Sequence, residues 1–149
     1  MNRLIQVLCV LMIFLGTPNA RADSKSETLN VVQAWIGALN RSDVNEIVGT
    51  FDANASFFGT SSKTLVTNSA GIRQYFENVY TQLSPLSVEL GEYVINELSP
   101  DSAVLTGYDK WKVTIDGKQV ERVGRLSIAV ARKDGQWHMV SFHRSSMPK

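Results

Sequence analysis

The sequence predicts an α+β domain in which helices pack on one face of a curved antiparallel sheet, with the element order α-α-β-α-β-β-β-β. Apolar residues recur at the three-and-four spacing of helices in the first part of the chain. From Leu86 onward they recur at the two-residue spacing of strands. Helices gathered early and hairpins gathered late are typical of this fold class.

Composition fits one globular domain. The chain has 149 residues, of which 44% are hydrophobic and 19% charged, and its formal net charge is +1. This near balance of charge argues against a nucleic-acid-binding class, because such proteins concentrate basic residues. We therefore expect no nucleic acid among the partners.

Residues 1–22 are predicted to be a secretory signal peptide, and residues 23–149 the folded domain. A short basic start ends at Arg3, an almost uninterrupted apolar run covers residues 4–16, and Ala20-Arg21-Ala22 is typical of a cleavage site. The apolar run is shorter than the roughly 20 residues that span a bilayer, so we expect no stable membrane anchor. The pattern predicts an exported protein, either periplasmic or secreted.

Cleavage after Ala22 would change the chemistry of the chain. It removes Arg3 and Arg21 from the 15 basic residues, leaving 13 against 14 acidic residues, and it removes Cys9, the single cysteine. The mature domain would then have no disulfide and would depend on its hydrophobic core for stability.

Three helices are predicted before the strands. The first covers residues 26–40, where Leu29 and Trp35 lie on the apolar face. Ser42 or Asp43 caps a second, shorter helix whose apolar face extends to Phe51. The third is capped by Ser69 and ended by Ser84-Pro85.

Five strands complete the expected fold. After a turn at residues 52–54, a short strand covers residues 55–59, and the polar loop 59–69 could lie over the mouth of a cavity. The four long strands are predicted at residues 86–98, 103–115, 120–131 and 137–142. Ser99-Pro100-Asp101, Asp116-Gly117 and Asp134-Gly135 separate them, and Asp-Gly is typical of tight hairpin turns.

Two stretches carry a resemblance to a known family. One is Tyr75-Phe76-Glu77-Asn78, and the other is Arg132-Lys133-Asp134-Gly135-Gln136-Trp137 continuing to Val140 and Phe142-His143-Arg144-Ser145. With the element order, they resemble the nuclear transport factor 2-like superfamily, also called SnoaL-like. Within it the sequence is most similar to the association domain of calcium/calmodulin-dependent protein kinase II and its stand-alone bacterial relatives.

The resemblance implies a cone, in which a curved sheet wraps a long helix and leaves a cavity at one end. It also implies pairing of two copies through the outer face of the sheet. Some members are enzymes and others only bind or oligomerise, so the fold does not give the function. Of the inward arginines of the kinase association domain, one matches Arg144, while Asp109 and Ile128 stand where two others would be.

Strand alternation then predicts the pocket. If Arg144 faces the cavity, as the resemblance implies, Phe142 and Val140 do too, whereas His143 faces outward. The same matching places Asp109 on the inner face. The predicted ligand-binding residues are Phe57 (or Phe58), Tyr75, Trp111, Phe142 and Arg144.

Asp109 allows two interpretations. It could be a general base in an apolar pocket, or it could form a partly buried ion pair with Arg144, which we favour. Arg122 and Arg125 are expected on a charged outer face, where Arg125 and His143 would contribute to an interface. His138 is expected to be solvated, and the two histidines form no recognisable metal site.

Three functional hypotheses follow. The leading one is a homodimeric binding module that holds a small apolar or weakly acidic molecule and needs no cofactor. The second is a cofactor-independent enzyme of the SnoaL or ketosteroid-isomerase kind, with Asp109 as base and Tyr75 as hydrogen-bond donor. The third is an oligomerisation scaffold resembling the kinase association domain.

Overall fold

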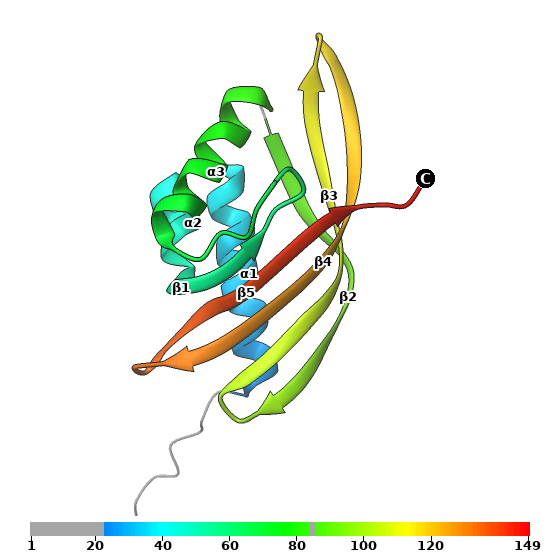
Figure 1. The fold of residues 1–149 in the computed structure, drawn as a ribbon. Helices are drawn as coiled ribbons and strands as arrows, with labels where there is room; N and C mark the ends of the chain where they lie inside the picture. The colour runs from blue at the N-terminus through cyan, green and yellow to red at the C-terminus, as the bar shows by residue number, and fades with distance from the viewer. Residues whose placement is uncertain (1–22, 84–85) are drawn as a thin grey trace, which may run out of the picture.

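The computed structural model describes residues 23–83 and 86–149 and has the predicted element order (Figure 1). The signal peptide predicted for residues 1–22 and the Ser84-Pro85 terminator lie outside the described residues. The helices are α1 (Ser24–Asn40), α2 (Val44–Gly49) and α3 (Ser69–Gln82). The strands are β1 (Phe51–Phe58), β2 (Leu86–Ser99), β3 (Ser102–Ile115), β4 (Lys118–Lys133) and β5 (Gln136–Ser146).

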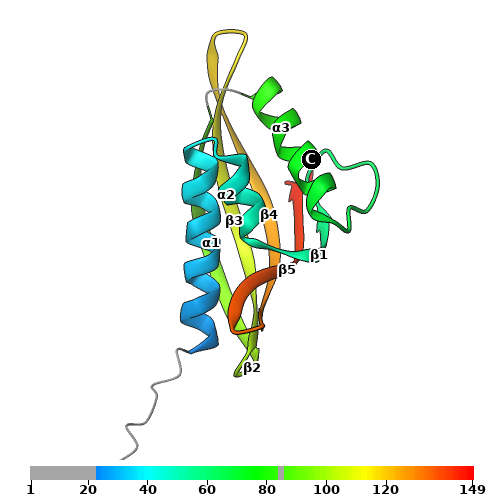
Figure 2. The same cartoon turned by 90° about the vertical axis from the view of Figure 1, so that its left-hand side faces the viewer.

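The strands form one curved sheet in the order β1-β5-β4-β3-β2, with the helices gathered on its concave face (Figure 2). The α1 helix crosses this face and packs mainly against β2 and β3. The side-chain amide of Asn40, at the end of α1, donates to the carbonyl of Val88 in β2 and accepts from its N–H. These two hydrogen bonds fix the end of the helix to the sheet edge. Within the described residues, no helix is long and apolar enough to cross a membrane.

Neighbouring strands run antiparallel except β1 and β5, which are parallel. Phe51 pairs with Met139 at the start of β1, and the carbonyl of Thr50 accepts a hydrogen bond from Met139. The prediction of a helical Phe51 followed by a turn at residues 52–54 was therefore wrong. A partner 88 positions away in the chain decides the conformation here, and local spacing does not reveal it.

Both Asp-Gly pairs form the predicted hairpin turns. Asp116 and Gly117 have φ of 50° and 74°, and Asp134 and Gly135 have φ of 50° and 80°. Two successive positive φ angles match the twist of a two-residue hairpin. The first of these hairpins carries β3 and β4 well beyond the end of β5 (Figure 1).

The helices begin at side-chain caps. The carboxylate of Asp23 accepts from the N–H of Lys25, and that of Asp43 accepts from Glu46. At α3 the cap is Asn68, whose side-chain oxygen accepts from the N–H of Gly71. The predicted cap Ser69 is instead the first helical residue, because the extended backbone at Asn68 places the capping oxygen one position earlier.

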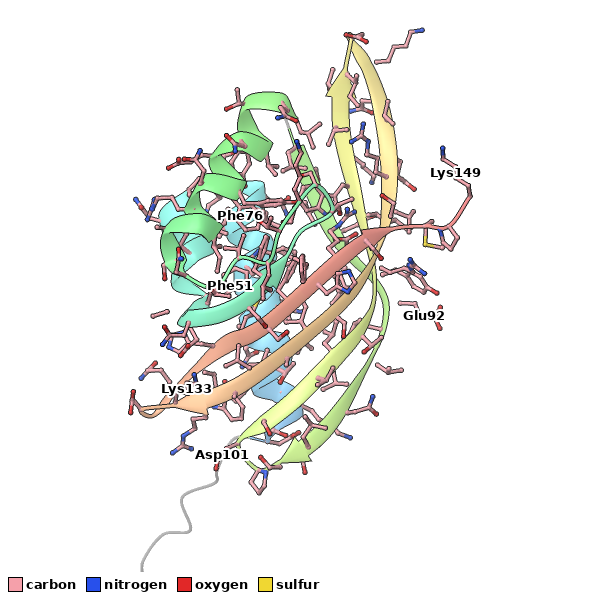
Figure 3. All side chains as sticks on the ribbon, in the orientation of Figure 1. Phe51, Phe76, Glu92, Asp101, Lys133 and Lys149 are labelled. Atoms are coloured by element: carbon pink, nitrogen blue, oxygen red, sulfur yellow. The ribbon has the colours of Figure 1, made fainter. Side chains whose placement is uncertain are left out.

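The core lies between the helices and the concave face of the sheet. Phe51 and Phe76 point into this layer in Figure 3, whereas Glu92 points away from it. Most sheet residues expected to face inward do so, but Val140 does not follow the alternation. The pairing of β4 with β5 shifts between Ala129 and Val130, so that Met139 is buried and Val140 only half-buried. A β-bulge at this point offsets the side chains by one residue.

Candidate functional site

A cavity of about 700 Å³ lies where α3, the β3–β4 hairpin and the loop after β1 meet. The end of β5 closes one side. Its lining residues come from all four segments: Thr60, Ser61, Lys63, Tyr75, Asn78, Val79, Gln82, Leu83, Trp111, Arg122, Val123, Arg144 and Ser146. This volume suits a small organic molecule.

A buried ion pair lies beneath the cavity. Asp109 in β3 has no exposed surface, and Arg144 in β5 is 8% exposed. The Nε of Arg144 donates to Oδ2 of Asp109 at 2.7 Å, and Nη2 donates to Oδ1 at 2.8 Å. Two parallel hydrogen bonds of this kind fix the guanidinium plane as well as its charge. The ion-pair interpretation of Asp109 is therefore the one that the geometry matches.

Further contacts hold the pair in place. The indole Nε1 of Trp111 donates to Oδ2 of Asp109 at 2.7 Å, and the guanidinium of Arg144 lies 4.7 Å from the centre of the Trp111 ring. The Nη1 of Arg144 donates to the hydroxyl of Thr60 at 2.7 Å. Arg144 thus reaches the cavity in a fixed orientation, with the indole face as a cation–π partner.

Two glycines provide the space for this arrangement. A Cβ at Gly124, which pairs with Asp109 across β3 and β4, would collide with the guanidinium of Arg144 and lie 2.6 Å from Oδ1 of Asp109. A Cβ at Gly59 would collide with the ring of Tyr75. The sequence therefore leaves out a side chain at each point where the site packs most closely.

The cavity wall is basic. Lys63, Arg122 and Arg144 line it, and none of the described lining residues is acidic. We expected Arg122 on the outer face, and that was wrong. Arg122 shares the inner-face alternation of Gly124, Leu126 and Ile128 in β4, and it pairs directly with Trp111.

Three predicted ligand-binding residues, Tyr75, Trp111 and Arg144, line this cavity, whereas Phe57 and Phe142 do not. The two phenylalanine rings stack at 5.0 Å between centroids, and both are buried in the core. They face inward as predicted, but α1, α3 and Phe51 fill the space over them. The alternative wall residue Phe58 is exposed on the other face.

Several lining residues were missed. Asn78 and Gln82 follow Tyr75 at helical spacing, so the periodicity of α3 could have revealed them. Thr60, Ser61 and Lys63 carry no periodic signal, because they lie in a loop. Their position depends on the bridge between Phe57 and Val66, which folds the loop back against β1.

The residues predicted for an interface lie outside the cavity. His143 is exposed on the convex face, and Arg125 is exposed there too and donates to the hydroxyl of Ser145. His138 is half-buried, contrary to the solvated position expected, because β1 joins β5 beside it. Across residues 23–83 and 86–149, no three His, Cys, Asp or Glu side chains gather as a metal site requires.

Residues 29–149 match the family model described as the SnoaL-like domain. Among curated proteins, none matches the sequence significantly. The family match covers every element that lines the cavity.

Solved structures share the fold at low sequence identity. A proposed calcium/calmodulin-dependent protein kinase II association domain from Xanthomonas campestris is 22% identical, with a TM-score of 0.75 and coverage of 83% of this chain and 87% of that one. An NTF2-like protein of unknown function from Pseudomonas putida is 17% identical, with a TM-score of 0.74 and coverage of 84% and 87%. A proposed NTF2-like dehydratase from Streptomyces avermitilis is 13% identical, with a TM-score of 0.74 and coverage of 85% and 98%. At these identities the likeness concerns the fold.

Proposed function

This chain belongs to the SnoaL-like domain family, and we propose that it is an exported binding protein that holds a small apolar or weakly acidic molecule in its cavity. The observation that carries the proposal is the composition of the cavity wall. Tyr75, Val79, Leu83 and Trp111 offer apolar surface, and Arg144 offers a fixed cation. A concave site that combines apolar surface with oriented polar groups can hold and orient a small molecule.

The contacts of Asp109 favour binding over acid–base catalysis. Its two oxygens accept hydrogen bonds from Arg144 and Trp111, and it is not among the residues that line the cavity. A general base must reach the proton that it abstracts. In the binding hypothesis Asp109 instead orients Arg144, which meets the acidic group of the ligand.

Native mass spectrometry tests this proposal. The protein is expressed with its leader in an exporting bacterium and purified from the periplasm without denaturation. We expect a mature chain that begins at Asp23 and carries a retained small molecule. The neutral fluorescent probe N-phenyl-1-naphthylamine should also bind in the emptied cavity.

Trp111→Ala should abolish both the retained molecule and the binding of the probe. Trp137→Ala is the matched control, since Trp137 lies at the β4–β5 turn away from the cavity, and it should leave both unchanged. An empty native protein that also fails to bind the probe would overturn the proposal.

We also propose that two copies associate through the convex face of the sheet. Val94, Thr106, Ser127, His143 and Phe58 form one row across all five strands of this face, without a Lys, Arg, Asp or Glu. Glu121 and Arg125 lie four residues apart on β4 and share the convex-face alternation of Ser127. Two copies placed face to face can therefore exchange ion pairs between these residues. A row of this kind with opposite charges beside it suits association of identical surfaces.

Sedimentation velocity tests the association. Arg125→Glu should convert a dimer into a monomer, because it adds repulsion at the contact. Arg132→Glu is the control, since Arg132 pairs with Asp101 at the far end of the sheet. A wild-type protein that sediments as a monomer would contradict the proposed homodimer and leave the cavity proposal intact.

A further inference from the structure

The charges around the cavity do not cancel. Lys63, Arg122 and Arg144 bring three positive charges to its wall, and the buried carboxylate of Asp109 neutralises one of them. Within the described part of the chain, neither Lys63 nor Arg122 has an ion-pair or hydrogen-bond partner. Two positive charges therefore remain uncompensated at the cavity.

These charges lie close to the fixed guanidinium. Arg122 pairs with Trp111 across β3 and β4, and the guanidinium of Arg144 lies over the ring of the same tryptophan. Directly paired residues on one face of a sheet have Cβ atoms about 5 Å apart. Both arginines are therefore neighbours of one tryptophan, Arg122 as its strand partner and Arg144 over its ring, and Lys63 lines the same cavity from the loop after β1.

The remaining donors suit an oxyanion with several acceptor oxygens. Three of the five guanidinium N–H groups of Arg144 are used by Asp109 and Thr60, which leaves two without a partner among the described residues. The hydroxyls of Ser61, Tyr75 and Ser146 and the amides of Asn78 and Gln82 also line the cavity. A carboxylate or phosphate group accepts such hydrogen bonds through several oxygens.

We infer that the ligand carries a compact dianionic head, either a phosphate monoester or a pair of neighbouring carboxylates, joined to an apolar body. The head lies between Arg122, Arg144 and Lys63, and the body packs against Val79 and Leu83 of α3. Two uncompensated positive charges select a dianion over a monoanion, which would leave one of them unmatched. This inference rests on the proposed binding function and narrows its ligand class.

Isothermal titration calorimetry with four matched aromatic compounds provides the test. Phenyl phosphate and phenylsuccinate are dianions at pH 8, phenylacetate is a monoanion and phenylacetamide is neutral. We expect the better dianion to bind at least 10-fold more tightly than phenylacetate, because each hydrogen-bonded charge contributes about that factor or more. Whether phenyl phosphate or phenylsuccinate binds more tightly identifies the head as a phosphate ester or a dicarboxylate.

Two variants locate the effect. Arg122→Gln and Lys63→Gln should each lower the affinity for the better dianion about 10-fold and change the affinity for phenylacetamide less than 2-fold. Arg132→Gln and Lys118→Gln are the matched controls, because neither residue lines the cavity, and they should have no effect.

The outcomes separate the two proposals. Binding of N-phenyl-1-naphthylamine together with equal affinities for phenylacetate and both dianions would overturn the dianion inference alone. A dianion preference that survives both Arg122→Gln and Lys63→Gln would also overturn it. Failure of the neutral probe and of all four compounds to bind would overturn the binding function itself.

Discussion

The concave face of the sheet has two halves that differ in what covers them. In one half, Phe142 stacks on Phe57 and packs edge to face with Trp35, and all three side chains are buried in the core. In the other half, Arg144 lies only two residues further along β5 and lines an open cavity with Trp111 and Arg122. The same three central strands build both halves.

The difference arises from the layer above the sheet. The α1 and α3 helices fill the space over Phe57 and Phe142, whereas only the edge of α3 and a loop cover Arg144. Strand alternation decides which side chains face inward. The helices and loops that lie over them decide whether an inward side chain belongs to a core or to a cavity.

Phe142→Ala should produce the largest loss of stability. We expect the free energy of unfolding to fall by about 3–5 kcal/mol, because the packed half cannot collapse around the missing ring. Urea unfolding of the variant and the wild type gives the difference. Ser146→Ala is the control from the cavity half of β5 and should change stability by less than about 0.5 kcal/mol. Similar losses for the two variants would remove the distinction between the halves.

Asp109→Ala should have the next largest effect. Arg144 would remain largely buried without its counter-charge, and we expect a loss of about 3 kcal/mol in the free energy of unfolding. The double variant Asp109→Ala/Arg144→Met should recover part of this loss, because it removes the uncompensated charge. If the double variant were less stable than Asp109→Ala, the unpaired charge of Arg144 would not explain the loss of stability in Asp109→Ala.

Gly124→Ala should cost roughly 1–3 kcal/mol, since the added methyl group meets both members of the ion pair. Gly49→Ala is the matched control, because a Cβ at Gly49 would meet no heavy atom within 4 Å beyond its chain neighbours and the adjacent backbone of its own helix. Thermal or urea unfolding would measure both. If Gly124→Ala were as stable as Gly49→Ala, the ion pair would not need the space that the glycine leaves.

Tyr80→Phe should have the smallest effect, about 1 kcal/mol, through loss of the hydrogen bond from its hydroxyl to the carbonyl of Leu39. This bond ties α3, which covers the cavity, to α1. Burial raises the pKa of Tyr80 to about 12, above the value of about 10 in the unfolded chain. The folded state thus holds this proton more tightly, so the stability that it contributes is complete below pH 10 and is lost as the pH rises toward 12.

Urea unfolding at several pH values between about 8 and 11 measures this dependence. The wild type should lose stability with rising pH more steeply than Tyr80→Phe. Tyr93→Phe is the control, because Tyr93 is exposed, and it should retain the wild-type slope. If the free energy of unfolding fell equally with pH in the wild type and in Tyr80→Phe, Tyr80 would not be the source of this pH dependence.

Local sequence patterns predicted the helices and strands and the face on which most of their side chains lie. Periodicity placed the helices and Asp-Gly placed two hairpins. The family resemblance, extended by strand alternation, placed Asp109 and Arg144 on one face, where they could pair. Local patterns failed where distant segments meet. Phe51 joins a strand because of Met139, and the bulge at Val140 offsets β5.

The same limit of local patterns explains why only part of the candidate site was predicted. Tyr75, Trp111 and Arg144 carry periodic signals, and they line the cavity. Arg122 has the inner-face alternation too, but its charge led to an outward assignment. Lys63 lies in a loop, where no spacing indicates the direction of a side chain.

The parallel pairing of β1 with β5 has a consequence for the order of folding. β1 covers residues 51–58 and its partner strand β5 covers residues 136–146, so during synthesis β1 lacks this neighbouring strand until almost the whole chain has emerged. Pairings between distant segments form slowly, since a long loop must close before the contacts stabilise it. The first strand in chain order, β1, can therefore join the sheet only after the last strand, β5, has been synthesised. For a chain proposed to cross a membrane before it folds, this topology delays the native sheet until translocation is nearly complete.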